Sequence, residues 1–130
     1  MTADEKNVIA AVQRMTHAFH EGDIEGVMSS YEPRATVVFE PGEPVSDPAR
    51  IRQMFQGMFP MNPRFEYSGH EVYVAGDTAT HFAPWSMTAA APDGSAIAQR
   101  GLSVAILRRQ ADGRWLMVID NPHGQRLLES

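Results

Sequence analysis

The sequence contains no cysteine, carries little positive charge and lacks any long apolar run. The absence of cysteine excludes disulfides, thiol catalysis and thiolate metal sites, and it fits a reducing compartment. The chain has 11 Lys and Arg against 16 Asp and Glu, a formal net charge of -5, and Arg108-Arg109 is its only short basic run. Because phosphate binding needs clustered positive charge, we expect no nucleic-acid partner.

No apolar stretch approaches the length that a membrane span requires, so we expect no membrane partner. Residues 1–6 are polar and acidic rather than signal-like, which together with the missing cysteine predicts a cytoplasmic protein. The chain has 130 residues, of which 43% are hydrophobic and 21% charged. These values are typical of one globular domain covering residues 1–130.

Helical signals are concentrated in the first half of the chain. Thr2 and Glu5 have the spacing of a capping box, and the apolar stripe that follows includes Met15 and Phe19. This pattern predicts a first helix that runs to about Glu21.

Two shorter helices are expected next. Asp23 has the chemistry of an N-cap for a short helix, which Pro33 ends. Ser46 or Asp47, followed by a proline, begins a third helix whose buried face includes Phe55.

Strand signals dominate the second half. A first strand is predicted at 35–40, and four more at about 64–75, 78–91, 95–109 and 114–121, separated by Gly-Asp or Asp-Gly turns. Helices followed by an antiparallel meander predict an α+β fold with helices packed on one face of the sheet.

Short strings accompany this order of elements over nearly the whole chain, and they lie at residues 12–14, 22–27, 31–37, 49–55, 76–79, 112–115 and 120–124. Their order and spacing resemble the nuclear-transport-factor-2-like superfamily, which includes ketosteroid isomerase and the SnoaL-like proteins. The resemblance implies a cone-shaped, cystatin-like fold, in which a curved, mostly antiparallel sheet wraps three N-terminal helices around an apolar cavity. It also implies a homodimer formed through the outer face of the sheet.

The residues that the resemblance places at the catalytic positions of ketosteroid isomerase differ here. The first-helix tyrosine position is Met15, and the position of the base is Phe39. The aspartic acid position falls at residues 103–104, which are Ser and Val. Of the two supporting tyrosine positions, one is Tyr31 and the other is Phe55. Because the reaction depends on these preorganised groups, we expect no steroid isomerisation by that residue set.

Three ionisable residues are candidates for general acid/base chemistry: Glu40, Asp120 and His123. Glu40 follows Phe39 directly, so both reach the cavity only if a bulge intervenes; otherwise Glu40 is a solvated strand-end carboxylate. The same alternation places Asn121 and His123 on one face and Asp120 on the other, which disfavours a simple Asp-His dyad. The segment around Asn121 also has the composition of a chain-terminating turn.

Candidate ligand-binding residues come from both halves of the chain. His81 and Trp85 share an apolar strand face and would bind by hydrogen bonding and stacking, although His81 alternatively belongs to the core. Arg100 either points inward as a carboxylate anchor or outward as a surface charge. The full set comprises Met15, Phe19, Tyr31, Phe39, Phe55, His81, Trp85, Arg100 and Asn121.

The sequence is consistent with two functions. One is cofactor-free acid/base chemistry of isomerase, lyase or hydrolase type on a small apolar or weakly acidic molecule. The other is a non-catalytic ligand-binding or protein-association domain. The five histidines are scattered and no ligand spacing is familiar, so we expect neither a metal nor an organic cofactor.

Overall fold

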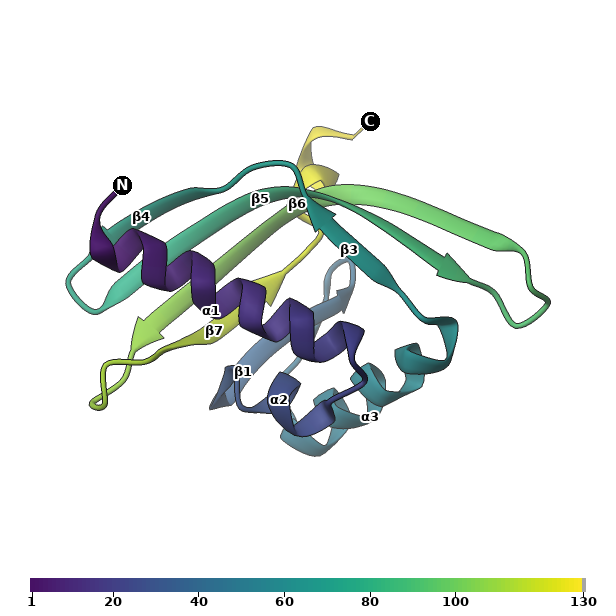
Figure 1. The fold of residues 1–130 in the computed structure, drawn as a ribbon, viewed down its shortest axis with the longest axis horizontal. Coiled ribbons are helices and arrows are strands. Elements are labelled where there is room, and N and C mark those ends of the chain that lie inside the picture. Colours follow the sequence, from purple (N-terminus) through teal and green to yellow (C-terminus); the bar gives the residue numbers. More distant parts are fainter. Residues whose placement is uncertain (130) are drawn as a thin grey trace.

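A curved sheet wraps around the first helix in a computed structural model that describes residues 1–129 (Figure 1). The helices are α1 (Ala3–His20), α2 (Ile24–Met28) and α3 (Pro48–Met58), with 3-10 turns at Phe59–Met61 and Gly124–Leu128. The strands are β1 (Tyr31–Glu40), β2 (Glu43–Val45), β3 (Arg64–Tyr67), β4 (Glu71–Ala75), β5 (Thr78–Ala90), β6 (Ala96–Arg109) and β7 (Trp115–Asn121).

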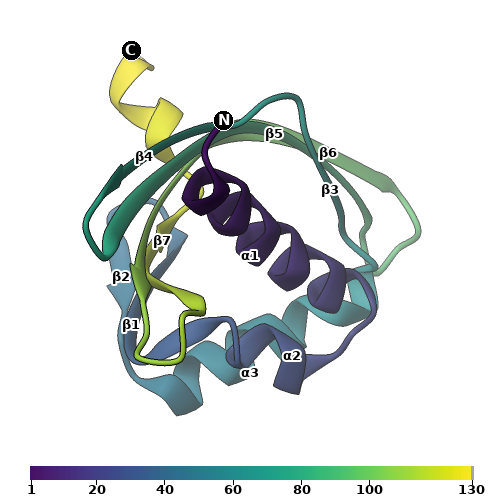
Figure 2. The same cartoon turned by 60° about the vertical axis from the view of Figure 1, so that its left-hand side comes forward.

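The sheet has the strand order β2-β1-β7-β6-β5-β3, and β4 pairs with the other end of β5. All pairs are antiparallel except β1 with β7, which is parallel. Figure 2 shows the sheet curling over α1, with α2 and α3 on the side away from the long strands. The expected α+β cone with a mostly antiparallel sheet is therefore confirmed.

The first helix is fixed at its start by a side-chain cap and along its length by an apolar face. The Glu5 backbone N–H donates to Thr2 Oγ1 at 3.1 Å, a cap that contributes about 1 kcal/mol. Val8, Val12 and Phe19 are buried in the main apolar cluster with residues of the sheet. This packing presents one face of α1 to the concave side of the sheet.

Three strand predictions need correction. The first strand, predicted at 35–40, begins at Tyr31, because the second helix already ends at Met28 and Pro33 lies within β1. The strand expected at 64–75 is interrupted at residues 68–70, so β3 and β4 pair with successive parts of β5. The segment Glu43–Val45, for which no strand was predicted, forms the short strand β2 against β1. Within residues 1–129, no helix is long and apolar enough to cross a membrane.

Candidate functional site

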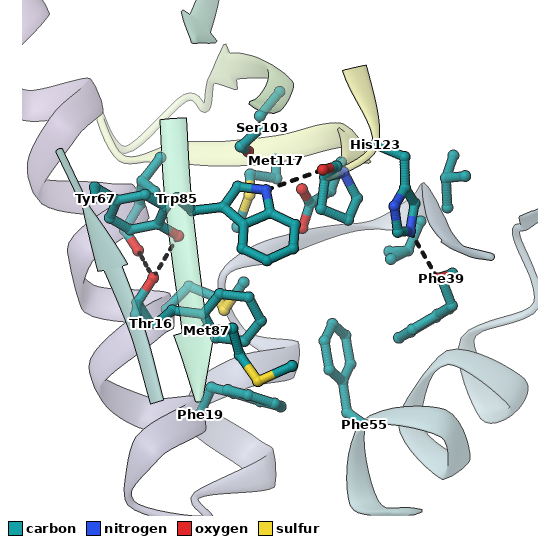
Figure 3. Close-up of a pocket in the computed structure, with 18 of the residues that line it drawn as sticks. Thr16, Phe19, Phe39, Phe55, Tyr67, Trp85, Met87, Ser103, Met117 and His123 are labelled. Carbon is teal, nitrogen blue, oxygen red and sulfur yellow. Dashed lines mark hydrogen bonds between the residues drawn. The ribbon is translucent and has the colours of Figure 1, made fainter. Parts of the chain in front are cut away.

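A cavity of about 160 Å³ lies between α1, α3 and the concave face of the sheet (Figure 3). We call it the inner cavity. The residues that line it are Val12, Met15, Thr16, Phe19, Val37, Val38, Phe39, Phe55, Met58, Phe65, Tyr67, Trp85, Met87, Gln99, Ser103, Ala105, Met117, Asp120, Pro122 and His123.

Aromatic rings supply much of the wall. The ring centroids of Phe19 and Phe55 are 5.9 Å apart, and those of Phe39 and Phe55 are 4.9 Å apart in an edge-on arrangement. Phe65 meets Trp85 in the same way at 5.3 Å. Aromatic rings pack well by stacking and edge contacts, so this part of the wall is closely packed and apolar.

Asp120 places a carboxyl group in this apolar wall. The Tyr31 hydroxyl donates to Asp120 Oδ2 at 2.5 Å. Burial raises the pKa of Asp120, and the opposing effects of the Tyr31 hydrogen bond and of the nearby His123 do not cancel that increase. Burial also raises the pKa of Tyr31 well above its usual value, so Tyr31 remains a proton donor to the carboxylate.

Ser103 adds a hydroxyl to the cavity wall from the strand next to Asp120. Asp120 is paired with Ala105 on the neighbouring strand β6, and Ser103 lies two residues from Ala105 on the same face. The two side chains are therefore diagonal neighbours on the concave face. No hydrogen bond occupies the Ser103 hydroxyl among residues 1–129, so this hydroxyl is available to a ligand.

A second tyrosine borders the cavity from β3. The Tyr67 and Thr16 hydroxyls are 2.9 Å apart, and Thr16 also donates to the Val12 carbonyl at 3.1 Å. Because the single Thr16 proton is used in that way, Tyr67 donates to Thr16. Burial is the main reason that the pKa of Tyr67 is raised to about 12, and the charge of Asp120 adds to the effect.

The turn after β7 closes one side of the cavity. Trp85 Nε1 donates to the Pro122 carbonyl at 2.9 Å, and His123 Nε2 lies 2.8 Å from the Phe39 carbonyl oxygen, as the dashed lines in Figure 3 show. A carbonyl can only accept, so the proton of this bond sits on His123 Nε2. These contacts tie the chain after β7 to both β5 and β1.

Seven of the residues proposed from sequence line the inner cavity, namely Met15, Phe19, Phe39, Phe55, Trp85, Asp120 and His123. Asp120 and His123 thus share the cavity, although strand alternation predicted opposite faces. The reason is that β7 ends at Asn121, so the alternation does not extend to His123. Tyr31 reaches the site through its bond to Asp120.

Glu40 and Arg100 lie outside the inner cavity and border a neighbouring cavity of about 650 Å³, which we call the outer groove. The register of β1 against β2 shifts between Val38 and Glu40. This bulge lets Phe39 and Glu40 border the same groove, and Glu40 remains exposed. Arg100 is exposed and shares the outward-facing pattern of β6, whereas Ser103 faces the inner cavity.

The other two proposed residues have structural contacts. His81 is fully buried and hydrogen-bonded to His70, with 2.8 Å between His81 Nε2 and His70 Nδ1. Burial, followed by the charge of His70, lowers the pKa of His81 to about 4, so the ring is neutral at pH 7. Asn121 Oδ1 accepts the His123 backbone N–H at 3.0 Å, which stabilises the turn that the sequence alternatively predicted.

Thr16, Tyr67 and Ser103 also line the inner cavity, although they were not predicted from the sequence as ligand-binding residues. Tyr67 lies two residues after Phe65, so strand alternation could have placed both on the cavity face. Thr16 directly follows Met15, and only packing of α1 shows that both reach the cavity. Within residues 1–129, no group of three or more His, Asp or Glu side chains is arranged to hold a metal ion.

Comparison with known proteins places the chain in a family. The sequence profile of the SnoaL-like domain matches residues 12–118. A search of curated proteins found no significant match.

Several solved structures share the fold. A protein from Catenulispora acidiphila, in complex with S-DNPA, is 20% identical with a TM-score of 0.80 over 100% of both chains. A Streptomyces avermitilis protein of the NTF2-like family, provisionally described as a dehydratase, is 18% identical with a TM-score of 0.79, covering 89% of this chain and 92% of its own. The association domain of C. elegans CaMKII is 18% identical with a TM-score of 0.74, covering 92% and 94%. The sequence match and the shared fold together confirm the resemblance inferred from sequence: the chain belongs to the SnoaL-like domain family within the nuclear-transport-factor-2-like superfamily.

Proposed function

We propose that the inner cavity binds a ring-sized, largely apolar molecule and that Asp120 transfers a proton to or from it without a cofactor. The observation that carries this proposal is the carboxyl of Asp120 in a wall built mainly from aromatic and methionine side chains. An apolar cavity of roughly 150 Å³ is large enough to bind benzene. The inner cavity, at about 160 Å³, therefore suits one ring.

The surroundings of Asp120 favour a role as general base and acid. A carboxyl with a raised pKa is a stronger base when ionised, and a larger share of it carries a proton near neutral pH and can then act as the acid. Its Oδ2 atom accepts from Tyr31, which leaves Oδ1 for a ligand. The Tyr31 bond also orients the carboxyl group.

Ser103 completes a minimal arrangement for proton transfer beside a carbonyl. Asp120 would take a proton from the carbon next to the carbonyl, and the C–H electron pair would move onto the carbonyl oxygen. The Ser103 hydroxyl, a diagonal neighbour of Asp120, would donate a hydrogen bond to that oxygen. In a substrate with a C=C bond conjugated to this enolate, the electron pair would return from the oxygen, the double bond would shift, and the proton from Asp120 would add to the far carbon, which completes an isomerisation.

The test uses 2-indanone, a small ring ketone with acidic C–H bonds, and follows hydrogen-deuterium exchange by NMR in D₂O. Wild-type protein should accelerate the exchange, and Asp120→Asn should reduce that acceleration by at least about 100-fold, as expected for loss of a general base. The asparagine can still accept from Tyr31, so the fold should persist. Glu40→Gln is the matched control, because Glu40 is exposed outside the inner cavity, and it should retain the activity.

Two results would contradict the proposal. Full exchange activity in Asp120→Asn would show that another group transfers the proton. Binding of 2-indanone by the wild type without accelerated exchange would instead support the non-catalytic binding domain.

A further inference from the structure

We propose that His123 is a second proton-transfer group in the inner cavity and that, with Asp120, it removes water from a cyclic β-hydroxy ketone. This inference rests on the proposed function of the inner cavity. It names the substrate class as a single ring that carries a hydroxyl on the second carbon from its carbonyl. Asp120 takes the proton from the carbon between these two groups, and His123 gives a proton to the departing hydroxyl.

Three hydrogen bonds hold His123 in place from three strands. Its backbone N–H donates to Asn121 Oδ1 at 3.0 Å, at the end of β7. The carbonyl of the preceding Pro122 accepts from Trp85 Nε1 on β5 at 2.9 Å. The ring itself donates from Nε2 to the Phe39 carbonyl on β1 at 2.8 Å. The imidazole is therefore positioned before any ligand arrives, which favours a chemical role.

The bond at Nε2 decides which ring nitrogen exchanges a proton. A backbone carbonyl only accepts, so Nε2 keeps its proton in both charge states of the ring. His123 Nδ1 makes no hydrogen bond among residues 1–129, so it is the atom that takes up and releases a proton. Figure 3 shows this nitrogen on the edge of the ring that faces Trp85. Imidazole exchanges protons near neutral pH, as such a role requires.

Asp120 and His123 share the inner cavity as separate groups. No hydrogen bond joins their side chains, because Asp120 Oδ2 accepts from Tyr31 and His123 Nε2 donates to Phe39. Burial raises the pKa of Asp120, and the charge of His123 opposes this rise, so the two side chains are close enough to interact. Two such groups can act on different atoms of one ligand, one as base and the other as acid.

The position of His123 at the mouth of the cavity suits the departure of water. His123 also borders the outer groove of about 650 Å³, whereas Asp120 lines the inner cavity alone. A ring with its carbonyl at Ser103 and its acidic C–H bond at Asp120 would hold its hydroxyl toward this mouth. The outer groove then gives the released water room to leave.

The proposed reaction balances without a cofactor. The Asp120 carboxylate takes a proton from the carbon beside the carbonyl, and the C–H electron pair moves onto the carbonyl oxygen. This pair then returns to form the C=C bond, and the C–O bond breaks with its electrons on the hydroxyl oxygen. That oxygen takes the proton from Nδ1 of the His123 imidazolium. The products are an enone and water, and solvent returns Asp120 and His123 to their first protonation states.

The test uses 3-hydroxycyclohexanone, a six-membered ring of the size that the inner cavity suits, and follows 2-cyclohexenone by ¹H NMR. Wild-type protein should accelerate the dehydration. His123→Gln should lower it at least about 30-fold more than it lowers hydrogen exchange of 2-indanone, since only the dehydration needs a second proton-transfer group. The glutamine amide can still donate to the Phe39 carbonyl. His17→Gln, at an exposed histidine of α1 outside both cavities, is the matched control and should keep the activity.

A second substrate separates proton donation from a structural role of His123. In 3-acetoxycyclohexanone the leaving group is acetate, which departs without taking a proton. His123→Gln should therefore lower the elimination of acetate at least about tenfold less than it lowers the elimination of water. An equal loss with both substrates would show that His123 only shapes the cavity, and it would overturn the inference.

The remaining outcomes distinguish this inference from the proposed function. If the wild type accelerates exchange of 2-indanone but not dehydration, or if His123→Gln dehydrates as fast as the wild type, the assignment of His123 is wrong while that of Asp120 stands. If the wild type accelerates neither reaction, both proposals fail.

Discussion

Replacing Tyr31 by phenylalanine tests whether the Tyr31 hydrogen bond sets the protonation of Asp120. The Tyr31 hydroxyl donates to Asp120 Oδ2 at 2.5 Å, and it is the one hydrogen bond to this carboxyl among residues 1–129. A hydrogen bond to a charged group contributes about 1.5–3 kcal/mol, against about 1 kcal/mol between neutral groups. Tyr31→Phe should therefore raise the pKa of Asp120 further.

The same substitution should change stability in a pH-dependent way. At low pH the carboxyl is protonated, and Tyr31→Phe should cost about 1 kcal/mol of unfolding free energy. As the pH rises through the folded pKa of Asp120, the carboxylate loses its donor in the variant, and the cost should grow to about 1.5–3 kcal/mol. Urea unfolding at several pH values measures this difference directly.

A ¹³C NMR titration of the Asp120 carboxyl carbon measures the pKa itself. Tyr73→Phe is the matched control, since Tyr73 also donates to a carboxylate, that of Glu71, but on the exposed surface. An unchanged or lower Asp120 pKa in Tyr31→Phe, or an equal change in Tyr73→Phe, would refute the reasoning.

Three further predictions follow from buried or crowded positions and from the outer sheet face. The folded pKa of His81 is lowered to about 4 from 6.5, so its contribution to stability is present above pH 6.5 and is lost as the pH falls from 6.5 to about 4. Unfolding measurements at pH 7.5 and 4.5 should show that His81→Leu removes about 2.5 kcal/mol of this acid sensitivity. An unchanged pH dependence would contradict the prediction. An added Cβ at Gly101 would lie 2.8 Å from Trp85 Cζ2, so Gly101→Ala should lower the free energy of unfolding by about 1–3 kcal/mol and lower Tm. Gly57→Ala, with open space around it, should not lower either quantity. Equal Tm values for the two variants would count against the close packing at Gly101. Family resemblance implies a homodimer through the outer sheet face, so Ile119→Lys should lower the mass measured by light scattering from that of a dimer to that of a monomer. Leu127→Lys, on the exposed C-terminal turn, should leave the dimer intact. A monomeric wild type would contradict this expectation.

The local parts of the fold could be predicted because they depend on nearby residues. Thr2, Asp23 and Asp47 each accept a backbone N–H at the start of a helix, as their side chains and positions indicated. Strand alternation likewise placed His81 and Trp85 on one buried face. These signals act over two to four residues and need no knowledge of the tertiary structure.

The site could be predicted only in part because it is assembled from distant segments. Parallel pairing of β1 with β7 brings Tyr31 to Asp120, across 89 positions of sequence, and no local pattern encodes that contact. The bulge before Glu40 and the end of β7 at Asn121 each changed which neighbouring side chains share a face. A prediction that assigns side chains alternately to the two faces of a strand assumes a regular strand, so it cannot detect a bulge or an early end.

Contacts between a small ring ligand and the cavity methionines would test the central claim most directly. We would label the methionine methyl groups with ¹³C and measure intermolecular NOEs from 2-indanone. The ring should show NOEs to the methyls of Met15 and Met117, which line the inner cavity with Asp120, and none to the exposed Met1. Bound 2-indanone without NOEs to Met15 or Met117 would show that the ring lies elsewhere and that Asp120 is not positioned to act on it.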